Sequence, residues 1–212
     1  MTAVLERGDA SFFYRPRVGA AEVRGLVDVQ RFFLILMPDG DRPYRRLIVG
    51  RKRLPDPGSH EREWAFVADV TSDAAALRAD IDAEPRARSA GTAWYALVDH
   101  EGHTHLAYVV VRPEGPAALR RELNVTPQAS YIAAVRNPDA PAPRGAGLPE
   151  HRRAQYPPAL RERFGGRRFI PANPPELLDY PGAELVLIGA AEDASPAPDL
   201  IRREAPAGAR AE

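Results

Sequence analysis

The segment Arg31-Phe-Phe-Leu-Ile-Leu-Met-Pro-Asp-Gly40 decides the fold class of this chain. It is a short apolar run, rich in Phe and Ile, that ends at a proline and a glycine, which is typical of a β-strand followed by a turn. A second segment, Leu106-Ala-Tyr-Val-Val-Val-Arg-Pro-Glu-Gly115, has the same composition and the same Pro-acid-Gly ending. The two segments therefore predict two strands that end in equivalent turns.

The strands around these two segments match as well. Gly8–Tyr14 precedes the first segment and Leu47–Asp56 follows it, whereas Gly91–Val98 and Ser130–Asp139 flank the second one. Both following stretches end in Pro-Asp. Two matched turns and three matched apolar runs in one order predict an internal duplication. The predicted pseudo-repeats span about residues 8–85 and 91–190.

The remaining apolar runs predict more strands and only a few short helices. Further strands are expected at Trp64–Val70, Arg168–Ile170 and Glu184–Ala190. Helices are expected at Ser72–Ile81, Pro116–Leu123, Pro157–Gly165 and Asn173–Tyr180, because these stretches begin with capping residues or proline. The predicted fold class is α+β, strand-rich and mainly antiparallel, in two duplicated halves. Residues 1–194 are expected to form a single globular unit, and the Pro/Ala-rich residues 195–212 a disordered tail.

Composition excludes several classes of protein. The chain has 212 residues and no cysteine, so it can hold no disulfide, thiolate metal site or cysteine nucleophile. Its longest apolar runs, Phe32–Met37 and Ala107–Val111, are far shorter than the roughly 20 residues of a membrane span. Charged residues at Glu6 and Arg7 interrupt the beginning of the chain, where a secretory signal would be apolar. We therefore expect a soluble, cytoplasmic protein without a membrane partner.

Five segments resemble an uncharacterised bacterial protein family of unknown function. They are Phe12–Arg17, Arg46–Pro55, His103–Tyr108, Asn137–Pro143 and Ala172–Glu184. The resemblance covers residues 6–192 and implies a bacterial origin and one ordered unit. It implies no activity, ligand or catalytic residue.

Arginines interleaved with aromatic residues form the first candidate site. Lys52 is the only lysine among 29 basic residues, so nearly every cation can bind phosphate or carboxylate through two parallel hydrogen bonds. Sheets that carry cations and rings bind nucleic acid. The candidate anion- or nucleic-acid-binding residues are Arg45, Arg46, Arg51 and Arg53, of which the last two are expected to share one strand face. The alternative is that these arginines form structural ion pairs, because the chain has equal numbers of acidic and basic residues.

The turn Asp99-His-Glu-Gly-His-Thr-His105 is the second candidate site. Gly102 suits a hairpin position with positive φ, and His103 and His105 then point to one face of the following strand. With His100, Asp99 or Glu101 as a third ligand, the turn could hold zinc or another divalent metal, and Glu101 is the only adjacent candidate for a base. The alternative is that these histidines are half-buried strand residues that bond to their neighbours.

The proline-rich stretch 137–158 is either a strap over the sheet or a loop that forms a site. Taken together, the sequence predicts a non-enzymatic binding module for an anionic ligand or nucleic acid. The first alternative is a metal-dependent enzyme centred on the Asp99–His105 turn, which alone would require a cofactor. The second alternative is a protein-interaction module that uses the proline-rich stretch, although no particular protein partner is indicated.

Overall fold

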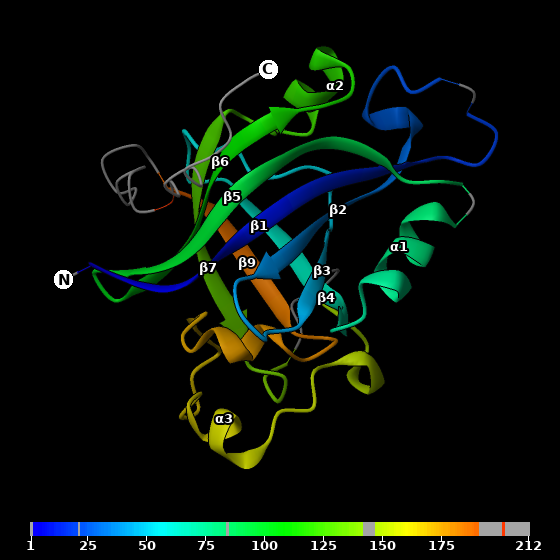
Figure 1. Ribbon diagram of the computed structural model, residues 1–212. Coiled ribbons are helices and arrows are strands. Elements are labelled where there is room, and N and C mark those ends of the chain that lie inside the picture. Colours follow the sequence, from blue (N-terminus) through cyan, green and yellow to red (C-terminus); the bar gives the residue numbers. More distant parts are fainter. Residues whose placement is uncertain (1, 21, 84, 142–146, 191–200, 202–212) are drawn as a thin grey trace.

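The strands close into a barrel (Figure 1). The computed structural model describes residues 2–20, 22–83, 85–141, 147–190 and 201. Its strands are β1 (Thr2–Pro16), β2 (Val29–Pro38), β3 (Tyr44–Val49), β4 (Arg62–Thr71), β5 (Arg88–His100), β6 (His103–Pro113), β7 (Gln128–Arg136), β8 (Phe169–Pro171) and β9 (Glu184–Gly189). Eight of them form the antiparallel barrel, which the pairing of β6 with β7 closes, and β8 is an extra strand on β7.

The strand order corrects the predicted fold class. Around the barrel, β1, β2, β3 and β4 are followed by β9, β7, β6 and β5, and β5 pairs with β1. The protein is thus mainly β rather than α+β, while the antiparallel pairing and the few short helices are confirmed. The barrel gives no evidence of duplication. The matched motifs also serve different connections: Pro38–Gly40 joins β2 to β3 directly, whereas Pro113–Gly115 leads into α2, so proline and glycine mark a strand end in both places without implying a repeat.

Side chains fill the inside of the barrel. Alternate residues of each strand point inward, and an eight-stranded barrel is just wide enough for such side chains to occupy it. Large buried residues of this core include Phe12, Phe32, Leu34, Leu36, Tyr95, Tyr108 and Tyr131. The barrel interior is therefore a core filled by side chains.

The helices lie outside the barrel and are short. They are α1 (Ala74–Asp82), α2 (Ala117–Glu122) and α3 (Pro158–Glu162), with a 3-10 turn at Pro175–Leu178 in place of the helix expected at 173–180. Leu77 and Ile81 of α1 pack on Phe33, Ile35 and Ile48 of the outer sheet face. No helix of the described residues is long and apolar enough to cross a membrane.

Different segments cover the two ends of the barrel, called here the α2 end and the α3 end (Figure 1). At the α2 end, the amide of Leu54 donates to the carbonyl of Leu123 at 3.0 Å, which ties the β3–β4 connection to the residues after α2. At the α3 end, Leu177 and Leu178 of the 3-10 turn are buried in the core. The Tyr156 hydroxyl donates to the carbonyl of Leu177 at 3.0 Å and fixes this turn.

Two segments singled out in the sequence are described only in part. Of the proline-rich stretch, residues 142–146 lie outside the described residues, and Arg153 Nη1 donates to the carbonyl of Pro138 at 3.0 Å. The predicted disordered tail 195–212 also lies outside the described residues, with the exception of Ile201. The Ile201 side chain is buried on the outer sheet face against Ala96, Val98 and Ala107.

Candidate functional site

Arg45 lies inside the barrel and is not available to a ligand. Its side chain is fully buried, because position 45 faces inward on β3. Arg45 Nη1 donates to Glu6 Oε1 at 2.6 Å, and Arg45 Nε donates to Asp179 Oδ1 at 2.6 Å. Burial alone lowers the pKa of Arg45, but the hydrogen bonds and charges of Glu6 and Asp179 outweigh it and leave the pKa above its ordinary value. Arg45 is a structural cation.

Arg46 points to the opposite face and is also paired. Its guanidinium binds the carboxylate of Asp69, and Nη1 lies 2.7 Å from Asp80 Oδ2. The same guanidinium stacks over the Phe33 ring, with Arg46 Cζ 5.5 Å from the ring centroid. Arg46 therefore links β3 to β4 and to α1 rather than facing solvent.

Arg51 and Arg53 lie in the turn after β3, which ends at Val49, so they do not share a strand face as predicted. Lys52 between them has φ of 64°, a left-handed conformation that breaks strand alternation. Arg53 pairs with Glu61, and the exposed Arg51 lies 3.3 Å from the buried carboxylate of Glu63. The four predicted arginines therefore lie in three different environments, each beside an acidic residue.

The histidine turn forms as the sequence predicts. Glu101 and Gly102 have φ of 51° and 79° at the tip of the β5–β6 hairpin. The His100 and His105 rings are 5.8 Å apart, with His100 Nδ1 2.8 Å from Thr2 Oγ1 and His105 Nδ1 3.1 Å from Ser130 Oγ. Burial and the nearby His100 and His103 lower the pKa of His105 to about 4.

These contacts do not bring His100, His103 and His105 together as a set of metal ligands. His103 is exposed, whereas His105 is buried beside Ser130. Within the part of the chain that the structure describes, no three His, Cys, Asp or Glu side chains are placed to hold a metal ion. The ring nitrogens that do have partners bind hydroxyl groups, which agrees with the alternative of strand histidines bonded to their neighbours.

Four other arginines, called here the arginine rim, lie outside the predicted candidate set: Arg17, Arg31, Arg88 and Arg112. Arg17 belongs to an arginine–aromatic stretch at Tyr14–Arg17 of the same kind as the predicted ones, whereas the other three give no signal in the sequence. All four are exposed, and none makes an ion pair with a described residue. By register, Arg31 lies opposite Arg15, Arg88 opposite Tyr14 and Arg112 opposite Thr92, which places all three near the strand ends at the same end of the barrel.

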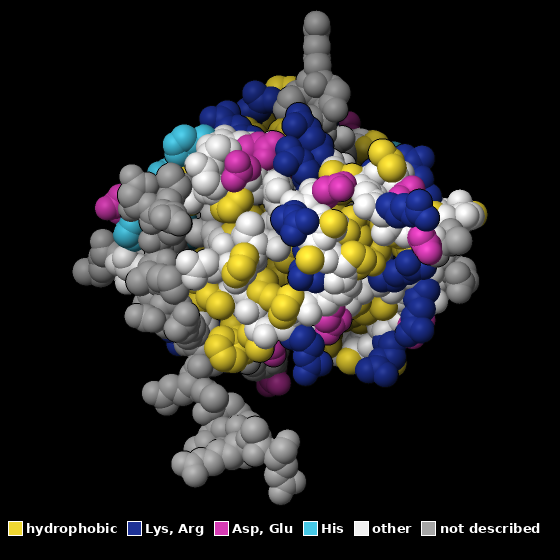
Figure 2. All heavy atoms as spheres, turned by 90° about the horizontal axis from the view of Figure 1, so that it is seen from above, with side chains coloured by type: hydrophobic (Ala, Val, Ile, Leu, Met, Phe, Trp, Pro, Cys, Tyr) yellow, Lys and Arg dark blue, Asp and Glu magenta, His cyan; other side chains and the backbone are white. Residues whose placement is uncertain are grey.

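The arginine rim follows four neighbouring strands at the α2 end. Strands β2, β1, β5 and β6 are adjacent in that order, and Arg17 directly follows β1. From strand spacing and rise, the rim spans roughly 20 Å. Figure 2 shows basic side chains, with acidic ones among them, around and within a face whose centre is largely apolar. Only the pairing register could reveal this rim, because its members lie 95 residues apart in the sequence between Arg17 and Arg112.

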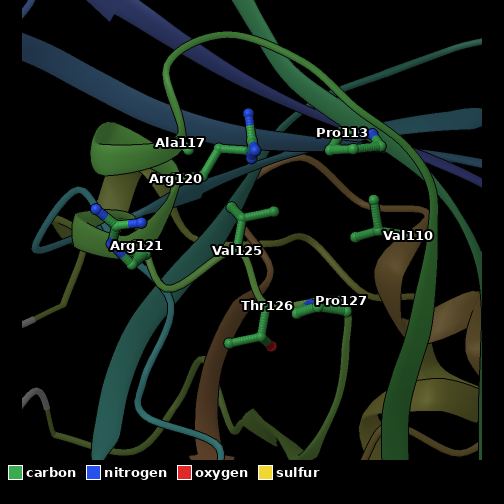
Figure 3. Close-up of a pocket in the computed structure, with 8 residues that line it drawn as sticks. All are labelled: Val110, Pro113, Ala117, Arg120, Arg121, Val125, Thr126 and Pro127. Carbon is green, nitrogen blue, oxygen red and sulfur yellow. The ribbon is translucent and has the colours of Figure 1, made fainter.

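A pocket of about 320 Å³ opens beside α2 at the same end of the barrel (Figure 3). This α2 pocket lies between the end of β6, helix α2 and the segment before β7. Its walls include Val110, Pro113, Ala117, Arg120, Val125 and Pro127. The pocket is thus mostly apolar with cationic side chains at its edge.

Comparison with protein-family models, with curated proteins and with solved structures gave no match for this chain. The resemblance to an uncharacterised bacterial family therefore stays a prediction.

Proposed function

We propose that this protein is a non-enzymatic binding module for an anionic ligand, and that its contact surface is the arginine rim. The observation that carries the proposal is the contrast between two sets of arginines. Arg45, Arg46 and Arg53 are neutralised by carboxylates, whereas the four rim arginines are exposed without such partners in the described structure. Unpaired guanidinium groups in one region create a positive potential that attracts anions even when net charge is zero.

The rim favours contacts with phosphate groups over recognition of bases. Aromatic rings on the same strands make other contacts: Phe12 packs against Tyr108 inside the barrel, and Phe13 stacks on Phe33 at 5.5 Å. The half-buried Trp94 of β5 packs on the outer-face cluster that contains Ala96. Base stacking requires an exposed ring, so the rim offers charge and hydrogen-bond donors instead. We therefore infer binding to polyanions without sequence preference.

Salt dependence tests this proposal. Affinity for a fluorescent oligo-dT strand is measured by anisotropy over a range of salt concentrations. If the four rim arginines contact phosphates, the log–log slope is about −3, at ~0.7 per phosphate on a single strand.

A pair of charge-matched variants locates the surface. The double variant Arg31→Glu with Arg112→Glu should weaken binding and flatten the slope. The control is Arg152→Glu with Arg163→Glu, which reverses two exposed arginines of the segment that covers the α3 end and leaves affinity unchanged. No binding at low salt, or equal losses in both variants, would reject the arginine rim as the contact surface.

The two alternatives from the sequence stay predictions. The described residues give no metal-ligand group for the enzyme alternative. The interaction alternative depends on a stretch whose residues 142–146 lie outside the described structure.

A further inference from the structure

The α2 pocket has an apolar interior and few polar groups that are free. Val110, Val125 and Pro127 are among the apolar residues that line its wall. The Thr126 hydroxyl at its edge already donates to the carbonyl of Gln128 at 2.9 Å. Small-molecule sites in proteins are mainly apolar clefts with a few placed polar groups, and their volumes begin at about 300 Å³. At about 320 Å³, the α2 pocket suits a small molecule with an apolar body.

Arg120 is the polar group that the protein holds in place at this pocket. Its Nη1 donates to the carbonyl of Glu114 at 2.9 Å and to the carbonyl of Gly115 at 2.5 Å. These two bonds use both hydrogens of Nη1 and fix the plane of the guanidinium. The edge formed by Nε and Nη2 has no partner among the described residues, and it presents two parallel donors, the pattern that a carboxylate accepts.

The neighbouring Arg121 differs in its placement. Figure 3 shows Arg120 extending toward Pro113 across the mouth of the pocket, whereas Arg121 lies on the other side of α2. Arg121 is exposed and makes no ion pair with a described residue, so it adds positive charge without a fixed geometry. A cation is therefore repelled from this pocket, and an anionic head group is attracted to it.

We propose that the α2 pocket binds a small amphipathic carboxylate, such as a medium-chain fatty acid. The chain lies against Val110, Val125 and Pro127, and the carboxylate accepts hydrogen bonds from Nε and Nη2 of Arg120. Because Arg120 is already held by two backbone carbonyls, little side-chain freedom is lost on binding. This site uses residues outside the arginine rim, so it goes beyond the proposed function and does not depend on it.

Calorimetric titration with decanoate tests the site, with decanamide as the neutral analogue of the same length and acetate as the head group alone. Decanoate should bind at one site per chain, decanamide at least about tenfold more weakly, because it lacks the charge-assisted hydrogen bonds, and acetate not measurably. No binding of decanoate, or equal affinity for decanoate and decanamide, would overturn the proposal.

Two neighbouring arginines provide a matched comparison. Arg120→Gln should weaken decanoate binding at least about tenfold, whereas Arg121→Gln should change it less than about threefold. If both variants lost the same amount of decanoate affinity, general positive charge and not the geometry of Arg120 would hold the ligand, and the proposal would be wrong.

A third variant keeps the test decisive if Arg120→Gln fails to fold. Ala117 is an exposed residue on the pocket wall, so Ala117→Phe fills the pocket without entering the core. This variant should abolish decanoate binding and keep the affinity for oligo-dT. Unchanged decanoate binding in Ala117→Phe would place the ligand elsewhere and overturn the proposal.

Discussion

Glu6 and Arg45 form an ion pair with two hydrogen bonds inside the barrel, where both side chains are almost completely buried. Arg45 Nη1 lies 2.6 Å from Glu6 Oε1, and Arg45 Nη2 lies 3.0 Å from Glu6 Oε2. The Tyr95 hydroxyl donates a further hydrogen bond to Glu6 Oε1 at 2.8 Å. Asp179 reaches Arg45 from the 3-10 turn at the α3 end, so this network joins the barrel wall to the segment that covers it.

Removing one member of this network should be strongly destabilising. Glu6→Ala leaves the Arg45 charge in the core with Asp179 as its remaining partner, and breaking a buried ion pair costs about 3–5 kcal/mol. Urea denaturation measures the free energy of unfolding. The double variant Glu6→Leu with Arg45→Leu should lose less stability than Glu6→Ala, because neither buried charge then remains.

The ion pair between Arg46, the neighbour of Arg45 on β3, and Asp69 of β4 provides the comparison. The Asp69 side chain is 54% exposed where it pairs with Arg46, so Asp69→Asn should cost less than about 1 kcal/mol. If Asp69→Asn and Glu6→Ala were equally destabilising, burial of the Glu6–Arg45 pair would not govern stability.

His105 should make stability fall at mildly acidic pH. Burial, with the nearby His100 and His103, lowers its pKa in the folded protein from 6.5 to about 4. As pH falls from 6.5 toward 4, the unfolded chain gains a proton that folded His105 cannot accept, so this contribution to stability is lost in that window. Above pH 6.5 both states are neutral and the effect vanishes.

The melting temperature at neutral pH and near the lower end of that window measures this effect. His105→Gln should lose less stability between the two conditions than the unmodified protein. The exposed His103 serves as the control: it is the smallest of the three causes that lower the His105 pKa, so His103→Gln should keep most of the pH dependence. Parallel pH profiles for all three proteins would contradict a role for His105.

Strand positions could be predicted from the sequence because apolar runs and turn residues are local signals. The strand expected around Phe32–Met37 is part of β2, and the proline at 38 ends it. The helix expected at 72–81 forms as α1, which begins two residues later, at Ala74. Its cap is Asp73, whose side chain accepts a hydrogen bond from the Ala75 amide at 2.8 Å. Both features depend on residues within a few positions of each other.

The candidate site could not be predicted in the same way because it depends on long-range pairing. Arg45 and Arg46 are adjacent in sequence, yet one faces the core and the other faces Asp69 on the outer side. The partner Asp179 is 134 residues away from Arg45 along the chain. Barrel closure requires β4 to pair with β9 and β5 with β1, and no local pattern specifies those pairs.

Ile201 should contribute to stability although the sequence predicts a disordered tail at residues 195–212. Its side chain is only 4% exposed and packs on Ala96, Val98 and Ala107. Ile201→Ala should cost about 2 kcal/mol, the lower end of the range for buried aliphatic truncations, and lower the melting temperature by ~4–8 °C. Val111→Ala, at a position 52% exposed, should change stability by less than about 0.5 kcal/mol. An Ile201→Ala variant as stable as Val111→Ala would show that this contact is energetically unimportant.

Gly189 should be intolerant of any side chain, because the β3–β4 connection crosses directly over it. A Cβ atom at Gly189 would lie 2.1 Å from the carbonyl oxygens of both Asp56 and Ser59, which is far inside van der Waals contact. Those carbonyls belong to the main chain and can move only if the connection shifts, so Gly189→Ala should cost about 1–3 kcal/mol, as overpacking does. Gly58 in the same connection is the matched control, since its Cβ would meet only Asp56 Oδ1 at an ordinary 3.5 Å. Gly58→Ala should leave the free energy of unfolding nearly unchanged, and equal urea midpoints for the two variants would mean that the connection does not rest on β9.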